Sequence, residues 1–129
     1  MPRFSSKSKK KLEECHPLLQ KLFNEVILGF DCTIQCGHRG EHEQNEAYRK
    51  NYSKLRYPES KHNKKPSLAV DVIPHPLDWK DTERMYFFAG YVKAKAEELG
   101  IDIRLGCDWD SDTEVKDQKF IDLPHFELR

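Results

Sequence analysis

Three residues that lie far apart in the sequence have side chains of the kinds that bind transition metals. His62 lies in a polar stretch, Asp71 interrupts an apolar run, and His125 stands near the end of the chain. A buried carboxylate without a partner costs several kcal/mol, on the order of the net stability of a small domain, so Asp71 needs compensation. Zinc binds imidazole nitrogen and carboxylate oxygen at about 2.0–2.2 Å, and a catalytic zinc keeps its fourth position open for water. We therefore interpret His62, Asp71 and His125 as zinc ligands.

A second carboxylate, Asp122, lies three residues before His125, across Leu123-Pro124. A carboxylate just outside the ligand set suits metal-assisted hydrolysis, because it can take a proton from water and later deliver it to a leaving amine. The residues alone leave an alternative open. In that alternative His62 is a loop histidine, Asp71 is a hydrogen-bonded core group and His125 is an exposed strand residue.

An acidic loop raises a separate hypothesis. Asp108, Asp110, Asp112 and Glu114 alternate like the oxygen ligands at the start of a calcium loop. The sixth position, which is glycine in an EF-hand, is Thr113 here. A calcium site at Asp108, Asp110 and Asp112 and a solvated acidic turn both stay open.

The elements that must position these side chains can be predicted from hydrophobic spacing. Helices are predicted over residues 17–29, from about residue 41, and over residues 82–99, the last with Asp81 as N-cap and Gly100 past its end. Strands are predicted over residues 30–36, 68–74, 101–105 and 122–128. This order indicates a single compact α+β domain over residues 1–129, with a small, mainly antiparallel sheet flanked by helices.

Two of these predictions concern the site directly. In the last strand, His125 and Glu127 share one face while Phe126 and Leu128 take the other. Residues 51–67 are polar and contain two prolines, so they are expected to form a long loop. Loops of this length in compact domains are often functional.

Charge and hydropathy exclude several classes of protein. Lysine plus arginine and aspartate plus glutamate both number 22, so no overall field argues for nucleic acid. No apolar stretch approaches the roughly 20 residues needed to cross a bilayer, and the N-terminus lacks the apolar region of a secretory signal. We expect a monomer that is made in the cytoplasm and does not insert into membranes.

The four cysteines lack the spacing of a zinc ribbon or a CxxC motif. A cytoplasmic setting disfavours disulfides. We therefore expect free thiols at Cys15, Cys32, Cys36 and Cys107.

An ordered set of motifs carries a family resemblance. The stretch "SKHN..PS.AVDV", preceded by "GHRGEHEQ" and followed by "DLPHFEL", resembles the zinc D-Ala-D-Ala carboxypeptidase and phage L-alanyl-D-glutamate endopeptidase family, particularly its bacteriophage endolysins. The likeness extends from about Phe4 to the C-terminus. The family pattern is Ser-x-His, then Ala-x-Asp, then an acidic residue three positions before a final histidine. Its members here are Ser60, His62, Ala69, Asp71, Asp122 and His125.

The resemblance implies roles for individual residues. His62, Asp71 and His125 would hold zinc, in a fold like that of hedgehog signalling domains and D-Ala-D-Ala peptidases. Asp122 would act as general base, and Ser60 would line the substrate cleft. Arg39 would contact the substrate and stabilise the oxyanion, for which a planar, permanently charged guanidinium is suited. Its alternative, read from the residues alone, is a surface arginine that pairs with Glu43.

The resemblance also implies an activity and a partner. The chain would hydrolyse an amide bond in the peptide stem of bacterial peptidoglycan, with L-alanyl-D-glutamate cleavage by a phage endolysin as the first choice. Such an enzyme would be made in the host cytoplasm and act at the cell wall or periplasm, here without a separate wall-binding domain. A D-Ala-D-Ala carboxypeptidase or dipeptidase is the close alternative. A zinc-stabilised binding module without turnover is the alternative of another class.

One departure from the family pattern concerns the ligand spacing. Eight residues separate His62 from Asp71, and Pro66-Ser67 forms the insertion relative to the compact form of the motif. The loop must bulge for both ligands to converge.

Overall fold

The computed structural model describes residues 2–129 and has the predicted α+β class. The helices are α1 (Ser6–Glu13), α2 (Pro17–Gly29), α3 (Glu41–Arg49), the short 3-10 helix η1 (Lys61–Asn63) and α4 (Thr82–Leu99). The strands are β1 (Cys32–Cys36), β2 (Ala69–Pro74), β3 (Ile103–Leu105) and β4 (His125–Leu128). Within the described residues, no helix is long and apolar enough to span a bilayer.

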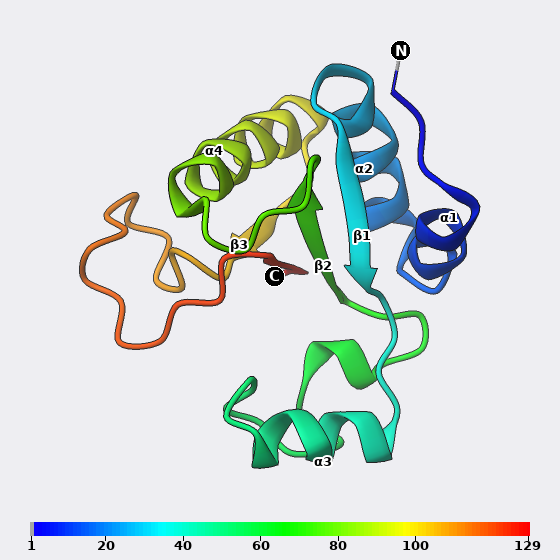
Figure 1. Ribbon diagram of the computed structural model, residues 1–129, viewed down its shortest axis with the longest axis vertical. Coiled ribbons are helices and arrows are strands. Elements are labelled where there is room, and N and C mark those ends of the chain that lie inside the picture. The colour runs from blue at the N-terminus through cyan, green and yellow to red at the C-terminus, as the bar shows by residue number, and fades with distance from the viewer. Residues whose placement is uncertain (1) are drawn as a thin grey trace.

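The strands form an antiparallel sheet in the order β1-β2-β4-β3. Figure 1 shows α1, α2 and α4 gathered around the sheet, whereas α3 and the segment that returns to β2 lie beyond one end of it. The strand carrying Asp71 is thus flanked by β1 and β4 and lies inside the sheet.

One face of the sheet builds the hydrophobic core. Val70 and Val72 of β2 and Phe126 of β4 are almost fully buried. The Phe126 ring packs edge-on against Phe23 of α2 at 5.4 Å and against Phe88 of α4 at 6.0 Å between ring centroids. Burying side chains of this size contributes roughly 1.5–3 kcal/mol each, so this face fixes the position of the strands.

The alternation of side chains along the strands sends the polar residues to the other face. Asp71 of β2 is the register partner of His125 of β4, and Ala69 is the partner of Glu127. Arg104 of β3 is in turn the partner of Glu127. The prediction that His125 and Glu127 share one face is correct.

The helix ends follow the sequence signals. At the start of α2, the N-cap residue His16 accepts the Leu18 N–H through Nδ1. At the start of α4, the Asp81 side chain accepts the Arg84 N–H. Gly100 ends α4 in the left-handed region with φ 71°, which costs glycine no side-chain clash. The sequence analysis did not predict η1, the short turn that carries His62.

The inserted residues Pro66-Ser67 are held by the N-terminal segment. Ser67 N donates to Glu14 O at 2.9 Å, and His16 N donates to Ser67 O at 2.8 Å. Ser67 is fully buried, and its hydroxyl donates to Gly37 O at 3.3 Å. The inserted pair is therefore tied to the body of the fold.

The cysteines in residues 2–129 are free thiols, as predicted. Burial raises the pKa of the Cys15 and Cys32 thiols to about 12, and burial also raises the pKa of Cys107. Because the thiolate is the reactive form, these thiols should resist iodoacetamide in the folded protein at pH 8 and react after unfolding in urea. Mass spectrometry of alkylated peptides measures this. Rapid native modification of Cys15 or Cys32 would contradict the burial.

Candidate metal centre

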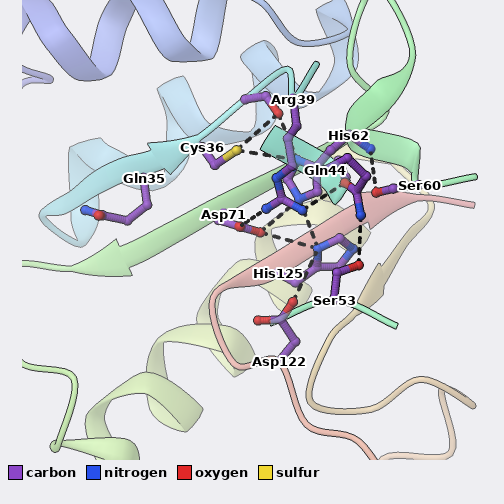
Figure 2. A network of polar contacts seen from close by, with 12 residues as sticks. Gln35, Cys36, Arg39, Gln44, Ser53, Ser60, His62, Asp71, Asp122 and His125 are labelled. Carbon is purple, nitrogen blue, oxygen red and sulfur yellow. Dashed lines mark hydrogen bonds and ion pairs between the residues drawn. The ribbon is translucent and has the colours of Figure 1, made fainter. Parts of the chain in front are cut away.

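The structure brings the three predicted ligands together on the polar face of the sheet. His62 Nε2 lies 3.1 Å from Asp71 Oδ1 and 3.3 Å from His125 Nδ1, and His125 Nδ1 lies 3.3 Å from Asp71 Oδ1. These atoms form a nearly equilateral triangle, and Figure 2 shows the side chains pointing toward one another. Such a group could hold a metal ion.

Two different devices position these side chains. Asp71 and His125 are register partners on adjacent antiparallel strands, which places their Cβ atoms about 4.5–5.5 Å apart. His62 lies in η1, where the Ser60 side chain accepts the His62 N–H and Asn63 completes a capping box. The His62 carbonyl accepts the Arg39 N–H at 2.8 Å, which joins η1 to the segment after β1.

In each histidine, the ring nitrogen that points away from Asp71 is hydrogen-bonded to an acceptor. That hydrogen bond decides which tautomer the ring adopts, and so which nitrogen offers a lone pair to the centre. His62 Nδ1 lies 2.8 Å from Gly37 O, and a carbonyl only accepts, so this nitrogen carries the proton. His125 Nε2 lies 2.8 Å from Glu127 Oε1 and donates to that carboxylate. His62 Nε2 and His125 Nδ1 therefore present lone pairs beside a carboxylate oxygen, and a cation is what such a triangle of acceptors requires.

Glu127 is the outer partner that the sequence analysis did not name as a site residue. Its side chain is 6% exposed and also pairs with Arg104 at 2.7 Å and Lys61 at 3.4 Å. Burial raises the pKa of Glu127, but the hydrogen bond from His125 and the Arg104 guanidinium outweigh burial and lower it to about 2. Glu127 is therefore ionised and acceptor-only. Its place on the strand, two residues after His125, was the signal available in the sequence.

The centre has a strong affinity for positive charge. Burial lowers the pKa of His62, but the negative charge of Asp71 and its hydrogen bond outweigh burial and raise it to about 10. Burial raises the pKa of Asp71, but the two histidines hold it well below its usual range. Without a metal ion, protons balance the charge of Asp71, and a metal ion would displace them.

Asp122 stands directly beside this triangle. Its Oδ2 lies 3.8 Å from His125 Nδ1, and its side chain is 28% exposed, so it faces both the ligands and solvent. Burial, together with the charge of Asp71, raises the pKa of Asp122 to about 6. A carboxyl group with a pKa this close to neutrality can both take and return a proton.

Arg39 also lies at the centre. Its guanidinium donates to Gln44 Oε1 at 3.0 Å and lies 3.5 Å from Asp71 Oδ2. Gln44 is itself fully buried and donates to Ser53 Oγ at 2.9 Å, so it fixes the arginine in place. The alternative of a surface arginine paired with Glu43 is wrong, because these contacts turn Arg39 toward Asp71 (Figure 2).

Two cavities meet at these residues. The first, of about 410 Å³, contains His62 and His125 together with Ser60 in its lining. The second, of about 690 Å³, contains Asp71 in its lining. The two share Tyr52, Phe120, Asp122 and Arg39. Ligand residues thus line two adjoining spaces.

Comparison with known proteins identifies the family. The family model for phage L-alanyl-D-glutamate peptidase matches residues 1–129. The chain belongs to this family.

Individual relatives agree with this assignment. The peptidase is 28% identical over 121 residues to the L-alanyl-D-glutamate peptidase of Escherichia phage T5, covering 90% of this chain and 88% of that protein. The crystal structure of the L-Ala D-Glu endopeptidase ChiX of Serratia marcescens matches with a TM-score of 0.76 and 26% identity, covering 98% of this chain and 90% of that chain. The resemblance and the enzyme class read from the motifs are confirmed.

The acidic loop of the peptidase has the geometry of a folded turn. Ligand atoms of Asp108, Asp110 and Asp112 lie within 4.8 Å of one another. The Asp108 carboxylate accepts the N–H groups of Asp112 at 3.2 Å and Thr113 at 2.8 Å, so it already organises the loop. The Glu114 side chain accepts the Lys116 N–H instead. Calcium at this loop stays a prediction.

Gly106 controls the turn that places Asp122 and His125. Gly106 N donates to His125 O at 2.8 Å, and Asp122 N donates to Gly106 O at 2.9 Å. A Cβ at Gly106 would lie 2.1 Å from Asp122 O and 2.8 Å from His125 Cβ. A methyl group therefore has no room there.

Gly106→Ala is expected to lower the free energy of unfolding by about 1–3 kcal/mol and to reduce cell-wall hydrolysis, because it separates Asp122 from the ligands. Gly90→Ala is the matched control, since a Cβ there meets nothing within 4 Å and alanine favours a helix. Urea unfolding and a turbidity assay on isolated walls measure both effects. Wild-type values for Gly106→Ala would contradict the close contact.

Proposed function

We propose that this peptidase is a zinc-dependent endopeptidase that hydrolyses the bond between L-alanine and D-glutamate in the peptidoglycan stem. The observation that carries the proposal is the triangle of His62, Asp71 and His125 with Asp122 beside it. Tetrahedral zinc with ligands at about 2.0–2.2 Å has ligand atoms about 3.3–3.6 Å apart. The observed separations of 3.1–3.3 Å lie at or within about 0.2 Å of the lower end of that range. Two imidazoles and one carboxylate are also a set of donors that binds zinc in preference to calcium or magnesium.

The protein groups divide the reaction between them. When bound, zinc would polarise the substrate carbonyl and would lower the pKa of water, so that the water can lose a proton and attack at neutral pH. Asp122 takes the proton from the attacking water and delivers it to the nitrogen of the departing D-glutamate. Arg39 stabilises the negative charge that develops on the carbonyl oxygen. Ser60 holds η1 in place and lines the first cavity.

The two adjoining cavities favour an endopeptidase over a carboxypeptidase. An endopeptidase must accept a chain that continues on both sides of the cleaved bond, and two adjoining cavities reach the ligands, one lined by His62 and His125 and the other by Asp71. A carboxypeptidase needs a cleft that ends at a terminal carboxylate. Asp122 and Arg39 support an enzyme over a pure binding module, which has no use for a proton carrier or an oxyanion partner.

The proposal includes a place of action. The chain acts as a monomeric catalytic domain of residues 1–129 on bacterial peptidoglycan, in the manner of a phage endolysin. It is made in the host cytoplasm and reaches the wall or periplasm when the inner membrane is permeabilised.

Digestion of isolated peptidoglycan tests the activity. The zinc-loaded protein is expected to release new D-glutamate amino termini, detected by amino-group labelling and mass spectrometry, and a zinc chelator should abolish the release. Released D-alanine would instead support the carboxypeptidase. Intact walls with zinc still bound would support the binding module.

Asp122→Asn removes the proton carrier while leaving the three ligands in place. It is expected to lower kcat by about 10²–10⁴-fold, the typical contribution of general acid–base catalysis, with zinc content unchanged. Asp102→Asn is the control, because Asp102 is 80% exposed and pairs with Arg129 outside both cavities. Full activity of Asp122→Asn would assign the proton transfer to another group.

A further inference from the structure

The two cavities differ in charge, and this difference bears on how the substrate lies across the centre. Besides the shared Arg39 and Asp122, the first cavity is lined by the cations Lys54, Lys61 and Arg104 and by the carboxylates Glu59 and Glu127. The second cavity has no other lysine or arginine among its described lining residues and is walled by apolar side chains, including Trp79, Met85, Ile121, Leu123 and Pro124. Lysines and arginines outnumber carboxylates in the first cavity, whereas Asp71 and Asp122 outnumber Arg39 in the second. An anionic part of the substrate is therefore better placed in the first cavity than in the second.

Most of these cations are already neutralised. Lys61 and Arg104 both pair with Glu127, at 3.4 and 2.7 Å. Arg39 lies 3.5 Å from Asp71. Lys54 is exposed and makes no ion pair with the carboxylates of residues 2–129. It is the lining cation of the first cavity without a carboxylate partner.

Lys54 is held near the place where the two cavities meet. Its Nζ lies 5.3 Å from the centre of the Phe120 ring, within cation–π distance. Phe120 lines both cavities, as does Asp122. The ammonium group thus lies in the first cavity beside a residue that both cavities share.

The proposed substrate carries an anion on one side of its cleaved bond. D-glutamate has two carboxyl groups; one continues the peptide stem and the other is free. L-alanine, on the amino side, offers only a methyl group. Resting on the proposed function, we propose that D-glutamate occupies the first cavity and that Lys54 binds its free carboxylate, with L-alanine directed toward the second cavity. Lys54 is thereby a specificity-determining residue that selects acidic stems over stems in which this carboxylate is an amide.

Two synthetic stem peptides test the proposal: one with the free carboxylate on D-glutamate and one with the corresponding amide. Wild-type zinc-loaded protein is expected to cleave the acid with a kcat/KM about tenfold higher than the amide, as the loss of one charge-assisted contact predicts. In Lys54→Gln this ratio should fall to near one, mainly through loss of activity on the acid. Lys54→Arg, which keeps the charge, should retain the preference.

The matched control is Lys50→Gln, because Lys50 pairs with Glu46 at 3.9 Å and lies outside both cavities. It should leave the ratio unchanged. An unchanged ratio in Lys54→Gln, or equal wild-type cleavage of acid and amide, would overturn the proposal while the endopeptidase stands. Failure of wild-type protein to cleave either peptide between alanine and glutamate would instead overturn the proposed function itself.

Discussion

The pairing of Asp71 with His125 across two antiparallel strands is the constraint on which the site depends. Side chains alternate between the faces of a sheet, so the same register that places these two side by side puts Val70 and Phe126 into the core. A slip of one residue would exchange the two sets and bury charge among Phe23 and Phe88. The hydrophobic core therefore stabilises the geometry of the metal centre without contacting it.

Hydrogen bonds to groups around the ligands then fix the orientation of the two imidazoles. Glu127 and the Gly37 carbonyl orient the two imidazoles, so their lone pairs meet at Asp71. Glu127 is itself balanced by Arg104 and Lys61 on the solvent side. Close packing adds to this precision at Gly37, where a Cβ would lie 2.3 Å from Lys11 O. The carbonyl that orients His62 is thus fixed against α1, an element far from it in the sequence.

The sequence predicted the parts of this arrangement that depend on local patterns. The α4 helix with its two caps, the strand around Asp71 and the two-faced last strand follow from periodicity and capping residues. The convergence of His62 on Asp71 required the family motif, because the residues alone left open the alternative that His62 is a loop histidine. The roles of Gly37 and Gly106 depend on contacts between segments that local spacing does not encode, whereas Glu127 lies two residues from its partner His125 on the same strand. The same holds for Arg39, whose side chain contacts Gln44 and Asp71 and not the nearby Glu43 of α3.

The number of protein ligands helps to distinguish a catalytic zinc site from a structural one. Structural zinc sites are usually closed by four protein ligands, whereas catalytic sites keep one position for water. Among residues 2–129, the group at this centre contains His62, Asp71 and His125 alone. Cys36 is the nearby thiol, but its Sγ lies 4.0 Å from His62 Nδ1, the nitrogen that faces away from the triangle. Asp122 and Arg39 stand beside the three ligands, one able to carry a proton and the other to hold developing negative charge, which is the environment that an attacking water requires.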